Sequence, residues 1–67
     1  MDDEIRFNIK LLALLKQKKM SQKTLASETG LPPAYISRFI NGTQIPTSGQ
    51  EYLVADALEV DKDEIFR

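Results

Sequence analysis

The chain has 67 residues, a formal net charge of −1, and neither cysteine nor histidine. This composition excludes disulfides, thiolate or imidazole metal sites and Cys- or His-dependent triads, so we expect no metal, no cofactor and no enzyme activity. The longest apolar run, residues 11–15, is far shorter than the roughly 20 residues that cross a bilayer, and the acidic start is unlike a signal peptide. We therefore expect one cytoplasmic domain over residues 1–67, with no membrane contact.

Opposite charges occupy different parts of the sequence. Residues 16–42 carry five basic side chains and one acidic one, a net charge of +4. Residues 43–67 carry two basic and six acidic side chains, a net charge of −4. A local excess of positive charge suits a nucleic acid, although lysines on an ordinary solvated face give the same pattern.

The first predicted helix runs from about Glu4 to Lys18. Asp2, Asp3 and Glu4 suit its start, because carboxylates cap free backbone N–H groups and favour the positive end of the helix dipole. Its core-facing residues recur at helical spacing and are Phe7, Leu11, Leu14 and Leu15.

The next two predicted helices are short and lie close together in the sequence. Ser21 is the expected N-cap of a helix over Gln22–Thr29, and Gly30 ends it because glycine tolerates a positive φ. Pro33 fits the first turn of the following helix, which runs to about Ile40 or Asn41 and ends at Gly42.

The rest of the chain continues as helix. A fourth helix is expected over Thr47–Leu58, with a weak start at Ser48 and Gly49, and Asp61 can cap a last turn through Phe66. No segment alternates like a strand, so we predict an all-α, compact bundle of four to five short helices. Beyond the first helix its apolar contacts come from Leu25, Ala26, Leu31, Ile36, Phe39, Ile40, Leu53, Val54, Ala57, Leu58, Val60, Ile65 and Phe66.

Two short helices joined by a glycine turn, with the small Ala26 in the first, form a helix-turn-helix pattern. The stretch SQKTLASETGLPPAYISRFING, residues 21–42, resembles the Cro/C1-type (Xre-like, lambda-repressor-like) helix-turn-helix family of DNA-binding regulators. The resemblance extends from about residue 7 to residue 66, through Ile45-Pro46 and the segment ADALEVDKDEIF. Its matching positions are Gln22, Leu25, Ala26, Gly30, Leu31, Ile36, Ser37, Asn41 and Gly42.

The resemblance implies that the helix from Pro33 lies in the DNA major groove. The implied base-reading positions are Pro33, Ala34, Ser37 and Arg38. Arg38 is the most informative, since a guanidinium can bind guanine O6 and N7 together, whereas the alternative is a phosphate contact without specificity.

The resemblance also implies contacts to the DNA backbone, because helix N-termini suit phosphates. Gln22 matches the phosphate-binding position at the start of its helix, with an ordinary surface glutamine as the alternative. Asn41 and Thr43 match the backbone-contacting end of the reading helix. Further candidates for phosphate are Lys19, Lys23 and Tyr35.

Two departures from the family pattern concern single positions. Pro32 replaces the usual capping Ser or Thr, and Pro33 has no N–H for a phosphate or a base, so the first readout position is left with shape or apolar contact alone. Leu15 and Ile40 stand where many relatives carry a buried Arg–Glu ion pair. A joint replacement by apolar residues is tolerated, whereas loss of one partner is costly.

A third departure is an apolar stripe on the predicted first helix, formed by Ile5, Ile9 and Leu12. Either the acidic C-terminal segment covers this stripe, or it is a dimer or partner interface. The other candidate dimer surface, where relatives often pair, lies near Ile45, Tyr52 and Val60.

The resemblance implies sequence-specific binding of double-stranded operator DNA by a small transcriptional regulator of the repressor or controller type. The expected form is a homodimer, at least on DNA, because two half-sites need two copies. The alternative is a protein-interaction module, such as an antitoxin or adaptor, whose acidic C-terminal segment binds a basic partner.

Overall fold

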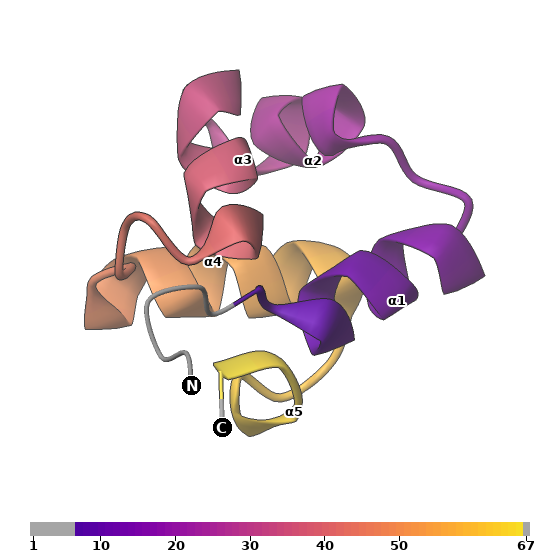
Figure 1. The fold of residues 1–67 in the computed structure, drawn as a ribbon. Helices are drawn as coiled ribbons and strands as arrows, with labels where there is room; N and C mark the ends of the chain where they lie inside the picture. The colour runs from indigo at the N-terminus through magenta and orange to yellow at the C-terminus, as the bar shows by residue number, and fades with distance from the viewer. Residues whose placement is uncertain (1–6, 67) are drawn as a thin grey trace.

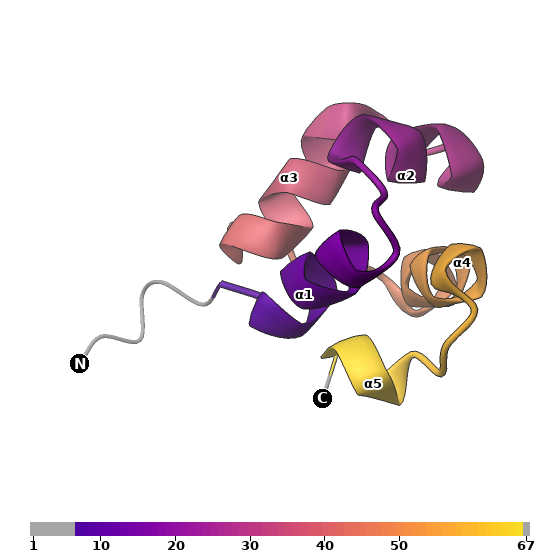
Figure 2. The same cartoon turned by 90° about the vertical axis from the view of Figure 1, so that its right-hand side faces the viewer.

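The computed structural model describes residues 7–66, and within that range the chain is all α, without strands. α2 and α3 lie together on one side, α1 and α4 form the middle, and α5 closes the opposite side (Figure 1). α2 packs against α3 and α4, while α1 packs against α5 and α3, as the turned view also shows (Figure 2). The predicted all-α class is confirmed. The helices are α1 (Ile9–Gln17), α2 (Gln22–Thr29), α3 (Pro33–Asn41), α4 (Ser48–Leu58) and α5 (Asp63–Phe66).

The core draws at least one buried side chain from every helix. Burying one such aliphatic side chain contributes about 1.5–3 kcal/mol. Leu15 and Ile40, where the sequence resemblance implied an ion pair in many relatives, are both buried as apolar residues in this core. The buried apolar residues are Leu11, Leu15, Leu25, Ala26, Ile36, Phe39, Ile40, Val54, Ala55, Leu58 and Ile65.

The start of α1 differs from the prediction. The helix begins at Ile9 rather than near Glu4, and Asn8 is its N-cap, with Oδ1 accepting a hydrogen bond from the Leu11 amide at 3.0 Å. Asp2, Asp3 and Glu4 lie outside the described residues. Phe7 precedes the helix and is 58% exposed, so its assignment to the core was wrong. The Asn8 amide donates to the Ile40 carbonyl at 2.7 Å, which ties this end of α1 to the last turn of α3.

Among residues 7–66, four turns that follow helices contain a residue with positive φ. Gly30 (+78°) and Gly42 (+76°) were expected there, but Lys19 (+54°) and Glu59 (+60°) are not glycines. Both hold Schellman turns: the amide of the following residue bonds back to Leu15 in one case and to Ala55 in the other. A side chain in this region carries steric strain that glycine lacks.

The helix α4 is better anchored at its start than the sequence indicated. Thr47 and Gln50 form a capping box, with bonds of 3.2 Å and 2.9 Å between side chain and backbone. Leu53, expected in the core, is 45% exposed and was wrongly assigned. The predicted last turn through Phe66 exists as α5, and the Asp61 carbonyl accepts the Glu64 amide at its start.

Candidate nucleic-acid interface

The pair α2–α3 is held by local polar contacts and one small residue. Ser21 caps α2 as predicted, its Oγ accepting the Thr24 amide at 3.0 Å. Ala26 is buried on α2, which packs against α3, and its small side chain allows close approach. Between the helices, the buried Thr29 hydroxyl donates to the Ala26 carbonyl and accepts from the Leu31 amide. The turn therefore satisfies its own buried polar groups.

The first turn of α3 begins with the double proline. Pro33 is the first helical residue, where its fixed φ suits the helix and its missing N–H removes no internal bond. Pro32 holds the N-cap position without a side-chain bond, and its carbonyl accepts the Tyr35 amide at 2.9 Å. This end of α3 therefore lacks the side-chain cap that α2 and α4 both have.

The helix α3 has one buried face and one outer face. Ile36, Phe39 and Ile40 point into the core. Tyr35 is half-buried, and its ring meets Phe39 edge-to-face at 6.2 Å between centroids. The remaining positions keep their side chains accessible: Pro33, Ala34 and Arg38 are exposed and Ser37 is half-buried. The four predicted base-reading positions thus stay open to a ligand on α3.

Two side-chain hydrogen bonds order the polar end of this face. Asn41 Nδ2 donates to Ser37 Oγ at 3.5 Å, and Arg38 Nη1 donates to Gln44 Oε1 at 3.4 Å. Gln44 was absent from the sequence prediction. Gly42 ends α3 with a positive φ, and the loop that follows places Gln44 next to an arginine six residues earlier.

Apart from the half-buried Tyr35 near the start of α3, the predicted phosphate-contacting residues lie in two places. Gln22 and Lys23 are exposed in the first turn of α2, and Lys19 is exposed in the turn that precedes it. Asn41 and the exposed Thr43 lie at the far end of α3. Within residues 7–66 no hydrogen bond or ion pair joins the first group to the reading positions of α3. The residues at the start of α2 and those at the end of α3 therefore form two separate exposed groups.

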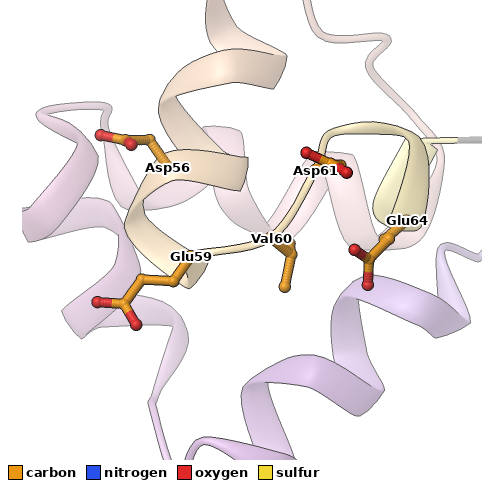
Figure 3. Close-up of a pocket in the computed structure, with 5 residues that line it drawn as sticks. All are labelled: Asp56, Glu59, Val60, Asp61 and Glu64. Atoms are coloured by element: carbon orange, nitrogen blue, oxygen red, sulfur yellow. The ribbon is translucent and has the colours of Figure 1, made fainter.

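The acidic segment forms a different surface at the end of α4. Asp56, Glu59, Asp61 and Glu64 surround Val60 in a shallow depression, with the Val60 side chain between Glu59 and Glu64 (Figure 3). Among residues 7–66, no cluster of three or more acidic side chains has the arrangement of a metal site. Lys62, between α4 and α5, places its Nζ 3.6 Å from Glu51 Oε1 and 4.6 Å from the centre of the Tyr52 ring.

The apolar stripe of the first helix is open in the described part of the chain. Ile9 is 71% exposed and Leu12 is 37% exposed, while Ile5 lies outside the described residues. The C-terminal segment packs on α1 through α5 but leaves these two side chains accessible, which argues against the alternative in which it covers the stripe. At the second candidate surface, Ile45 is 88% exposed, Tyr52 is 61% exposed and Val60 is half-buried.

No helix among the described residues combines the length and apolar character needed to cross a membrane.

Comparison with known proteins bears on the whole fold. No curated protein matches the chain. A helix-turn-helix family model matches residues 11–65, from the third residue of α1 to Ile65 in α5. Because this match spans most of the chain, and includes the α2–α3 pair with its glycine turn, the chain belongs to the Cro/C1-type helix-turn-helix family.

Proposed function

We propose that the chain is a single-domain, sequence-specific regulator of transcription that binds double-stranded operator DNA in the cytoplasm, with α3 in the major groove. One observation carries this proposal. The buried face of α3 is wholly apolar, whereas its outer face presents Arg38 within a segment of net charge +4. An exposed helix face that carries a cation suits the width of the major groove and the charge of its phosphates.

Base readout falls to the outer face of α3. Arg38 binds guanine O6 and N7, and Ser37 donates or accepts one further hydrogen bond. Ala34 contacts a thymine methyl group, while Pro33 contributes apolar shape alone.

Backbone contacts come from both ends of the helix pair. Gln22, Lys23 and Lys19 meet phosphates at the start of α2, and Tyr35, Asn41 and Thr43 meet them beside α3. Such contacts fix the register of the protein on the duplex and carry no sequence information.

Two copies are needed for a full operator, because one reading helix covers only a half-site and paired half-sites lie about one helical turn, or about 34 Å, apart. We assign the dimer contact to the stripe of Ile5, Ile9 and Leu12, because Ile9 and Leu12 lie three residues apart on α1 and both stay accessible on one helix face. The surface around Ile45 and Tyr52 is the competing candidate.

Sedimentation of two matched variants separates these surfaces. Ile9→Glu is expected to dissociate the dimer, alone or on operator DNA, while the helical circular dichroism and cooperative unfolding persist. Ile45→Glu places the same charge on the competing surface and is expected to leave the dimer intact. The reverse pattern moves the interface to Ile45 and Tyr52.

Selection from a random pool of duplex DNA tests the function itself. We expect enrichment of an inverted repeat with one guanine contact per half-site. Recovery of a symmetric site reports DNA binding and dimeric recognition in one measurement. Failure to enrich any sequence, by protein that is folded, contradicts the proposal.

A second candidate function is a protein-interaction module such as an antitoxin or adaptor. The carboxylates around Val60 favour it, since they give the C-terminal half a surface for a basic partner. In that case the selection enriches nothing, and reversing charge with Glu59→Lys weakens the complex with the partner. Under the DNA-binding proposal, Glu59→Lys leaves operator preference unchanged.

A further inference from the structure

The hydrogen bond between Arg38 and Gln44 joins the cationic side chain of α3 to the loop behind it. The bond from Arg38 Nη1 to Gln44 Oε1 is 3.4 Å long. Arg38 is exposed and Gln44 is half-buried, and the bond between them lies at the surface of the protein. Within residues 7–66 the guanidinium has no carboxylate partner, so its charge is uncompensated by the protein there.

The backbone holds Gln44 beside α3. Gly42 adopts φ +76°, and its amide donates to the Arg38 carbonyl. The Thr43 amide donates to the same carbonyl at 3.0 Å. These two bonds fold the chain after α3 back onto Arg38, whose side chain bonds to Gln44. The backbone therefore holds the loop beside Arg38.

This contact leaves a defined part of the guanidinium free. The group has five N–H donors in a rigid plane, and Gln44 takes one of those on Nη1. The opposite edge, formed by Nε and Nη2, keeps two parallel donors, which is the arrangement that binds guanine O6 and N7. A neutral amide oxygen orients the group without cancelling its charge.

We propose that Gln44 is a positioning residue that orients Arg38 for guanine; the proposal rests on the DNA-binding function above. Asn41 contacts Ser37 in a similar way. Its Nδ2 donates to Ser37 Oγ at 3.5 Å, so the hydroxyl hydrogen of Ser37 stays available to the ligand. The polar part of the reading face therefore offers two kinds of donor, the free guanidinium edge of Arg38 and the hydroxyl hydrogen of Ser37. It selects base edges that present acceptors, guanine at the Arg38 position and a second acceptor such as a purine N7 beside it.

Binding to the selected half-site and to its single-base variants tests this role. Gln44→Ala is expected to reduce the preference for guanine at the Arg38 position by about threefold to tenfold, a range typical of coupled neighbours. Affinity for nonspecific duplex and the salt dependence stay the same, since no phosphate contact is lost. In an Arg38→Ala background, Gln44→Ala changes nothing further.

Two more variants guard against a merely structural effect. Gln44→Glu keeps an acceptor oxygen beside Arg38 Nη1 but pairs the guanidinium charge, so it retains the order of base preference while lowering affinity for every duplex, through that pairing and through repulsion of phosphate. Gln17→Ala, an exposed glutamine at the end of α1, changes neither quantity. Thermal unfolding followed by circular dichroism checks that each variant is folded.

The same data contain the outcomes that overturn the proposal. If Gln44→Ala binds every sequence more weakly by one factor, Gln44 is a backbone contact. If Gln44→Ala keeps the full guanine preference, Gln44 does not orient Arg38. Loss of that preference in Gln44→Glu as well overturns the orienting role, even if the alanine variant is unfolded. Failure of the proposed function looks different, because the wild-type protein itself then discriminates between no duplexes.

Discussion

The two halves of the chain share one core but carry opposite surfaces. Residues 16–42 hold a net charge of +4 and residues 43–67 hold −4, yet both supply fully buried side chains such as Leu25 and Leu58. In the acidic half, Lys62 is paired with Glu51 and Tyr52. In the basic half, Arg38 bonds only to a neutral amide among the described residues. The contrast shows a division within each helix. The buried side chains stabilise the fold, and the exposed side chains carry the charges that a ligand meets.

The first test asks whether the core is really common to both halves. Leu25→Ala on α2 and Leu58→Ala on α4 remove side chains with 0% exposure from each half. Each is expected to lower the free energy of unfolding by about 2–5 kcal/mol, because a cavity is left in a packed interior. Urea unfolding followed by circular dichroism measures both.

A single cooperative transition in each variant supports one core. If Leu58→Ala instead unfolds in two steps, with the α2–α3 pair surviving the first, the halves are independent units and the comparison fails.

The second test separates the surfaces by removing one cation from each half. Arg38→Ala is expected to weaken cognate binding by about 1–3 kcal/mol and to relax preference at one base position per half-site. Lys62→Ala removes a charge that is already paired, so its effect on DNA affinity is expected to be near zero. Fluorescence anisotropy on cognate and shuffled duplexes measures both variants. An equal loss on all sequences for Arg38→Ala reduces that residue to a phosphate contact.

The sequence predicted the buried residues and the helix bounds better than the side-chain contacts between a helix and a loop. Helical periodicity and glycine signals identified α2 and α3 with their bounds, because those signals act within a few residues. The predicted start of α1 was wrong. The acidic residues upstream were expected to cap the helix, but Asn8 is the residue that caps it. Contacts such as Arg38–Gln44 were missed, since they appear only once a positive φ has fixed the direction of the loop.

The third test uses the two strained charged residues, one in each half. Lys19→Gly and Glu59→Gly remove side chains from positive-φ positions, at +54° and +60°. Each is expected to raise the free energy of unfolding by about 1 kcal/mol. Only Lys19→Gly is expected to weaken DNA binding and to lower the slope of log affinity against log salt by roughly one unit.

Thermal unfolding and salt titrations distinguish the two residues. An unchanged salt slope in Lys19→Gly shows that this lysine does not meet phosphate, and that the basic half is an ordinary solvated face at this point. A weakened operator complex in Glu59→Gly shows that the acidic half contributes to binding.

The last and smallest effect concerns how the helices of the two halves begin. α4 starts with the Thr47–Gln50 capping box, whereas α3 starts with Pro32 and no side-chain cap. Thr47→Ala is expected to lower the free energy of unfolding by about 1 kcal/mol. Pro32→Ser regains a cap worth a similar amount but loses the restriction that proline places on the unfolded chain, so its net effect stays within about 0.5 kcal/mol of zero. Urea unfolding measures both, and a gain of a full cap in Pro32→Ser shows that the proline gives no compensating rigidity.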